Sequence, residues 1–171
     1  MNHMKDSNLG LREKMQYKKD WQWSDGYLLV IEQILRQNAM YLLDVQISNN
    51  NKDTKQATDM VITVKGGDVA VRVRRPYRDF RDLTIRAWRS SGVKTELTKL
   101  KEGFADWYFY GWSDDKGGFL DWMLVDLDKL RQSGLLENLL MTFNTDQTTG
   151  FVSINWDELN AHGCLVASSR I

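Results

Sequence analysis

The spacing of hydrophobic and polar positions changes along the chain, and each change predicts an element of secondary structure. Over residues 24–38 the apolar side chains recur every three or four positions, which is the period of an amphipathic helix. They are Tyr27, Leu28, Ile31, Ile34 and Leu35. From residue 41 the period shortens to two, which is typical of half-buried strands. A first helix followed by strands and further helices favours the α/β class.

The rest of the chain continues this mixture of strands and short helices. Apolar alternation predicts strands at residues 41–48, 59–64, 69–74, 83–89, 105–112, 119–127, 151–154 and 164–167. Capping residues and terminating glycines predict further helices. These helices begin at Thr95, at Asp126 or Asp128, and at Asn155.

The segment from residue 59 to residue 74 has the pattern of a β-hairpin. If residues 65–68 form its turn, Val64 pairs with Val69 and Asp59 lies opposite Arg74. One face would be apolar, with Met60, Ile62, Val64, Val69, Val71 and Val73. The other face would carry Asp59, Val61, Thr63, Ala70, Arg72 and Arg74. The register therefore predicts a carboxylate beside two guanidinium groups.

Arginines are concentrated from the second strand of this hairpin onward, at Arg72, Arg74, Arg75, Arg78, Arg81, Arg86 and Arg89. The whole chain is neutral, with 23 Lys plus Arg and 23 Asp plus Glu, so this surplus is local. A local surplus of positive charge on a sheet favours contact with phosphates. We expect nucleic acid, DNA before RNA, to bind at Arg72, Arg74, Arg75, Arg78, Arg86 and Arg89. Trp88, between Arg86 and Arg89 on the expected polar face, is the predicted base-stacking residue.

The hairpin, with its acid on one strand and a basic residue ending the next, resembles the core of the PD-(D/E)XK nucleases. In that superfamily an Asp and a second acid, two residues before a Lys, hold a divalent metal. The resemblance implies a restriction-endonuclease-like fold, with a mixed central sheet flanked by helices. It also implies a catalytic set of Asp59, Arg74 and Glu32, in which Asp59 and Glu32 bind Mg²⁺ or Mn²⁺. Arg72 stands where the second acid belongs, and a guanidinium neither binds a cation nor acts as a base.

Other interpretations of the same residues stay open. Asp59 and Arg74 also fit an ordinary cross-strand ion pair, and Glu32 fits a glutamate at the edge of a helix. Asp44 and Glu96 are further candidate carboxylates. Three functions follow: a metal-dependent nuclease, a nuclease-like domain that only binds nucleic acid, or a phage or mobile-element accessory protein that binds an acidic protein partner.

Composition limits the remaining choices. A chain of 171 residues with 42% hydrophobic residues and seven tryptophans can bury one sizeable core. We expect a polar segment at residues 1–20 and a single domain over residues 21–171. Cys164 is the only cysteine, which excludes a disulfide within one chain. No apolar run approaches ~18 residues, so we expect a cytoplasmic protein without a membrane segment.

Overall fold

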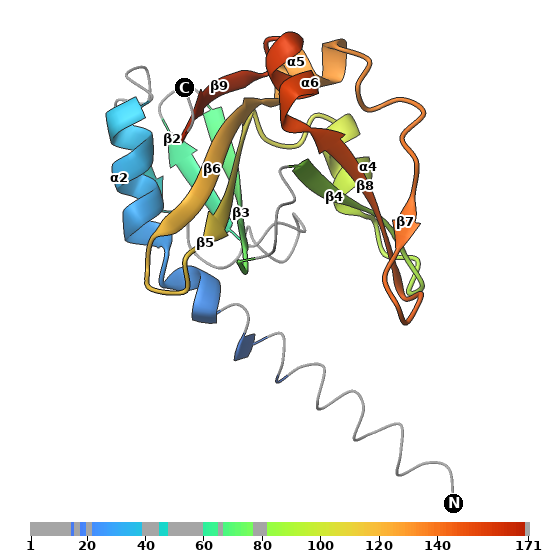
Figure 1. Ribbon diagram of the computed structural model, residues 1–171, viewed down its shortest axis with the longest axis horizontal. Coiled ribbons are helices and arrows are strands. Elements are labelled where there is room, and N and C mark those ends of the chain that lie inside the picture. Colours follow the sequence, from blue (N-terminus) through green and yellow to red (C-terminus); the bar gives the residue numbers. More distant parts are fainter. Residues whose placement is uncertain are drawn as a thin grey trace, which may run out of the picture.

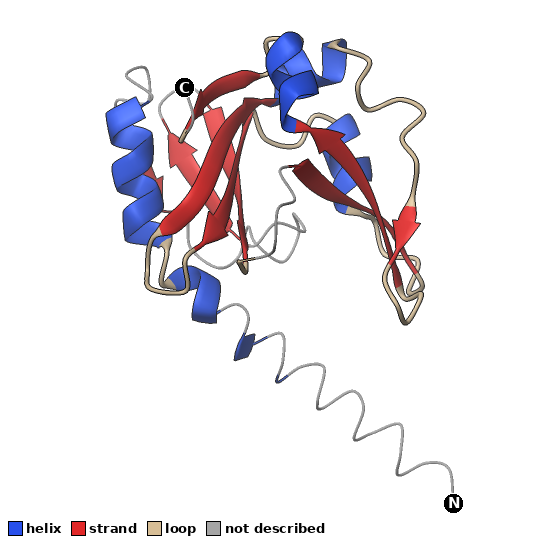
Figure 2. Cartoon of the chain, viewed as in Figure 1, coloured by secondary structure: helices blue, strands red, loops and turns tan. Residues whose placement is uncertain are grey.

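The computed structural model describes residues 15, 18–19, 22–38, 45–47, 60–64, 67–76 and 82–169. Its helices are α2 (Leu28–Asn38), α4 (Glu96–Lys101), α5 (Leu127–Gln132) and α6 (Trp156–Ala161). Its strands are β1 (Val45–Ile47), β2 (Met60–Val64), β3 (Gly67–Arg74), β4 (Asp82–Arg89), β5 (Trp107–Ser113), β6 (Phe119–Asp126), β7 (Thr142–Phe143), β8 (Thr149–Asn155) and β9 (Leu165–Ser168). The chain contains both helices and strands, as the sequence predicted, and the α/β class is confirmed (Figure 2).

The described strands form a large sheet and a small sheet. The large sheet has the order β1-β2-β3-β5-β6-β9, and the small sheet has the order β4-β8-β7. Only β3 and β5 run parallel among the paired strands of the described residues, so the large sheet is mixed, as expected. The small sheet was not anticipated, because β4 follows β3 in the chain but pairs with β8. Figure 1 shows the small sheet running away from the large sheet on the side opposite α2.

Both faces of β3 are buried, and each belongs to a different core. Val69, Val71 and Val73 pack against α2 in one cluster, where Ile31 and Leu35 of the helix are buried. Ala70 lies in the second cluster, which also holds buried residues of β4, β8 and the short helices. Adjacent residues of a strand point to opposite faces, so β3 separates two cores. The large sheet is therefore the central layer of the molecule (Figure 1).

The short helices begin where their capping residues predicted. The Thr95 side chain accepts a hydrogen bond from the backbone N–H of Thr98 at the start of α4. Asp126, rather than Asp128, caps α5. Asn155 caps α6 in a capping box with Glu158. None of the described helices is long and apolar enough to cross a membrane.

The hairpin of β2 and β3 forms, but the predicted register is wrong. Val64 lies opposite Gly67 and Met60 opposite Val71, which is a shift of two residues along β3. The strands continue closer to the turn than a loop over residues 65–68 allows. Because the side-chain period of a strand is two, this shift leaves the residues of β3 on their predicted faces. The expectation that the face of Arg72 is open to solvent is also wrong, because the second core covers it.

Candidate functional site

A buried polar centre lies between the two sheets and consists of Arg72, Glu96, Tyr108 and Tyr110. Arg72 Nη1 donates to Glu96 Oε2 at 2.6 Å, and the two side chains are only 7% and 1% exposed. The Tyr108 hydroxyl donates to the other carboxylate oxygen, Glu96 Oε1. The backbone N–H of Arg86 donates to Glu96 Oε2 at 3.2 Å. One carboxylate thus receives donors from β3, β4 and β5.

Local structure explains why Glu96 reaches this position. Thr95 caps α4, and Glu96 occupies the first helical turn directly after it. Leu100, four residues later and therefore on the same side of the helix, is buried in the core between the sheets. The helix consequently turns the carboxylate inward together with Leu100. A buried charge is costly unless it is paired and hydrogen-bonded, and Arg72 meets that requirement.

The two tyrosines of the centre are held in their neutral form. Burial raises the pKa of Tyr108 well above its usual value, and the negative charge of Glu96 raises it further against the opposing effect of Arg72. Burial also raises the pKa of Tyr110, whereas the positive charges of Arg74 and Arg72 lower it. A protonated Tyr108 can donate to the carboxylate. The centre is therefore a buried ion pair whose carboxylate also receives a hydroxyl donor.

The prediction that Arg72 contacts nucleic acid must consequently be corrected. Its guanidinium is buried against Glu96, because α4 and the small sheet cover the face that was expected to be open. Arg74, two residues later on the same face, is half-buried, and Arg75 is exposed. The guanidinium carbon of Arg75 lies 4.5 Å from the ring centroid of Trp23, a cation–π contact. Arg72 on β3 and Arg75 directly after it are thus engaged within the molecule.

The structure does not bring the expected catalytic residues together. Glu32 lies on α2, where it pairs with Arg36 at 2.9 Å. That helix packs on the β3 face of Val69, Val71 and Val73, whereas Arg74 lies on the opposite face. Asp59 lies outside the described residues, and so does Arg78. Within the described part of the chain, no three His, Cys, Asp or Glu side chains are grouped to hold a metal ion.

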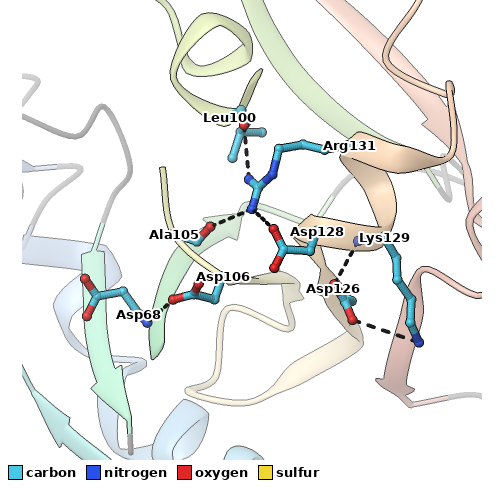
Figure 3. A network of polar contacts seen from close by, with 8 residues as sticks. All are labelled: Asp68, Leu100, Ala105, Asp106, Asp126, Asp128, Lys129 and Arg131. Atoms are coloured by element: carbon cyan, nitrogen blue, oxygen red, sulfur yellow. Dashed lines mark hydrogen bonds and ion pairs between the residues drawn. The ribbon is translucent and has the colours of Figure 1, made fainter. Parts of the chain in front are cut away.

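A second polar network lies just before the start of β5, around α5 (Figure 3). Arg131 donates to the carbonyl oxygens of Leu100 and Ala105 at 3.1 and 3.3 Å and pairs with Asp128 at 2.7 Å. Asp106 accepts from the backbone N–H of Asp68 at 2.8 Å. These carboxylates each have a protein donor, so the network fastens α4, α5 and β3 to one another.

A basic cluster consists of Arg89 on β4, Lys94 in the following loop and Lys99 on α4. Burial lowers the pKa of the Lys99 ammonium, and the nearby positive charges of Arg89 and Lys94 lower it further against the opposing charge of Glu102. Lys94 also pairs with Glu102 on the surface. Arg89 and Lys94 are thus close enough to Lys99 to repel its ammonium, and a bound anion would offset that repulsion.

Trp88 is exposed, as expected, but it lies on the other face of β4. The pairing of β4 with β8 has a bulge between Arg86 and Trp88, so that Arg86 lies opposite Phe151 and Trp88 opposite Gly150. Gly150 belongs to the core-facing row of β8, with Val152 and Ile154. A bulge adds one residue to a strand and reverses the faces that follow it. The expectation that Trp88 shares a face with Arg86 is therefore wrong.

Sequence reasoning missed the partners that define these sites. Glu96 was a weak candidate, and the signal that could have raised it is its place between the cap Thr95 and the apolar residues of α4. No sequence pattern distinguished Tyr108 from the other aromatic residues of β5. Lys94 and Lys99 contributed to the predicted charge surplus without being singled out. Comparisons with protein-family models, with curated proteins and with solved structures found no match.

Proposed function

We propose that this protein binds nucleic acid through the basic cluster of Arg89, Lys94 and Lys99. The observation that carries the proposal is the proximity of Arg89 and Lys94 to Lys99, whose pKa is lowered by burial and by these two charges. Arg86, half-buried on β4, adds a further positive charge to the same strand. On a chain of zero formal charge, such a concentration is a local anion-binding feature rather than a consequence of composition.

The proposal is for binding rather than cleavage. Glu96 is paired with Arg72. Glu32 is on α2, which packs on the face of β3 opposite to that of Arg74. A nuclease that uses Mg²⁺ or Mn²⁺ would therefore depend on Asp59, the remaining member of the expected catalytic set. A restriction-endonuclease-like core is part of the hypothesis. The mixed large sheet with α2 packed on one face supports it, because the resemblance to the PD-(D/E)XK nucleases implied a mixed central sheet flanked by helices.

A salt titration of binding tests the proposal. Duplex and single-stranded DNA are titrated against wild type and against a triple variant, Arg89→Ala, Lys94→Ala and Lys99→Ala. The slope of log affinity against log salt should flatten by about one unit for each lost phosphate contact. A matched control removes the same charge elsewhere, by Arg36→Ala, Lys116→Ala and Lys129→Ala, at exposed positions outside the cluster. Equal effects of both triple variants, or no binding by wild type, would refute the proposal.

The same preparation distinguishes binding from catalysis. DNA and RNA substrates are incubated with wild type and with Asp59→Asn in the presence of Mg²⁺ or Mn²⁺. We expect both proteins to leave the substrates intact while binding persists. Cleavage by wild type that a chelator and Asp59→Asn both abolish would overturn the binding-only assignment in favour of the metal-dependent nuclease.

A further inference from the structure

Exposed apolar side chains gather at the end of the small sheet that lies far from the large sheet. Four large hydrophobic residues are exposed there: Trp88 at 39%, Leu140 at 90%, Met141 at 43% and Phe143 at 50%. Trp88 is on β4 and Phe143 is on β7, and Leu140 and Met141 directly precede β7. In Figure 1 this end of β4, β8 and β7 projects away from the rest of the molecule. An exposed apolar group of this kind on a soluble domain commonly marks a binding surface.

The two aromatic residues form a row across the small sheet with a glycine between them. Trp88 and Phe143 both lie opposite Gly150, from the two sides of β8. Their ring centroids are 5.5 Å apart, and the rings meet edge to face at 70°. A Cβ at Gly150 would lie 2.7 Å from Met141 Sδ and 3.2 Å from the Phe143 ring. The glycine therefore lets the rings and Met141 close over β8. We call Trp88, Gly150 and Phe143 the aromatic row.

The basic cluster borders the β4 side of this row. Arg89 directly follows Trp88 and lies opposite Thr149. Its side chain points to the other face of β4, which is one of the two edge strands of the small sheet; β7, with Phe143, is the other. Lys99 is on α4, which packs against β4, and it is electrostatically coupled to Arg89. The aromatic row thus crosses the small sheet from β7 to β4, and its β4 end lies beside the positive charges.

We propose that the aromatic row and the basic cluster beside its β4 end bind single-stranded nucleic acid, with unpaired bases on Trp88 and Phe143 and phosphates at Arg89, Lys94 and Lys99. The inference rests on the proposed function and adds the substrate class. Aromatic side chains bind bases by their faces, and only an unpaired strand presents those faces, because a duplex buries them in its own stack. The adjacent cations favour a polyanion over an apolar protein segment as the occupant.

Fluorescence anisotropy with a labelled oligothymidylate and a labelled duplex of matched length tests the inference. Wild type should bind the single strand more tightly than the duplex. Trp88→Leu and Phe143→Leu keep an apolar side chain but remove the ring, and each should weaken single-strand binding by about tenfold or more. Their effect on the duplex should be small. Trp88→Phe keeps a ring and should retain most of the affinity, whereas Leu120→Ala, an exposed apolar change on β6, should have no effect.

The outcomes separate this inference from the proposed function. If wild type binds duplex and single strand equally and the ring variants bind like wild type, the single-strand inference fails while nucleic-acid binding stands. If wild type binds neither probe, the proposed function fails. Circular dichroism of each variant confirms folding before binding is compared. Sedimentation of wild type and Trp88→Leu adds a last outcome: a dimer lost in the variant, with unchanged nucleic-acid binding, would make the row a contact between two copies and overturn the inference.

Discussion

Replacing Glu96 with Gln should destabilise the fold far more than an ordinary surface substitution. The carboxylate receives Arg72 Nη1 at 2.6 Å, the Arg86 backbone N–H at 3.2 Å and the Tyr108 hydroxyl. A glutamine amide has one carbonyl oxygen, and its NH₂ group would face one of these donors. The charge of Arg72, 7% exposed, would also lose its counter-ion. Removing one partner of a buried ion pair typically costs about 3–5 kcal/mol, and we expect Glu96→Gln to fall in that range.

The same reasoning predicts that removing both partners costs much less than the sum of the single changes. Arg72→Met leaves Glu96 buried without its counter-ion and should be destabilising by a similar amount. The double variant Arg72→Met with Glu96→Leu removes both charges from the core. Well-packed apolar replacements of buried ion pairs are often neutral or stabilising, so the double-mutant cycle should show strong coupling between the two positions.

Urea denaturation followed by circular dichroism measures each free energy of unfolding, with the slope against urea checked for constancy. Glu32→Gln is the control, because Glu32 and Arg36 form a surface pair on α2 that is worth at most about 1 kcal/mol. A loss below about 1 kcal/mol in Glu96→Gln, or additive single and double variants, would refute the argument. In that case the core between the sheets would tolerate an uncompensated guanidinium, and the buried pair would have no structural role.

Two further predictions concern the same core. Burial raises the pKa of Tyr108 above its usual value of ~10, so the unfolded chain loses that proton first as the pH rises. Stability from this group is complete below about pH 10 and declines above it, and Tyr108→Phe should flatten the decline in urea titrations between neutral and alkaline pH; an unchanged slope would contradict the assignment. Gly111→Ala would place a Cβ 2.5 Å from a Phe119 ring carbon. The resulting overpacking should lower the unfolding free energy by about 1–3 kcal/mol. If the variant unfolds at the same temperature as wild type, this prediction is wrong.

Local rules predicted most elements of this fold, but not how they assemble. The periodicities over residues 24–38 and 59–74 depend on nearest neighbours, and they yielded α2 and the hairpin of β2 and β3. The caps at Asp126 and Asn155 are equally local. The pairing of β4 with β8 joins residues some seventy positions apart in the chain. No local pattern distinguishes a strand that continues one sheet from a strand that begins another.

The candidate site shows the same limit at the level of single residues. The positive surplus was visible in the sequence, and part of it, Arg89, belongs to the basic cluster. Arg72 was assigned to the surface because charged residues are rarely buried unless paired, and its partner Glu96 lies on a different element. Trp88 changed faces because of one bulge, which alternation cannot anticipate. Partners and faces that depend on tertiary pairing were therefore beyond the reach of pattern alone.

The division of the arginines between the two sheets indicates where binding would act. Arg72 on β3 is bound to Glu96, and Arg75, directly after β3, contacts Trp23, so these charges stabilise the molecule's own packing. Near the small sheet, burial and the charges of Arg89 and Lys94 together lower the pKa of Lys99, against the opposing charge of Glu102. A phosphate bound beside Lys99 would offset the repulsion that Arg89 and Lys94 exert on it. Under the proposed function, binding therefore acts at β4 and α4, where the basic cluster lies, and not at β3.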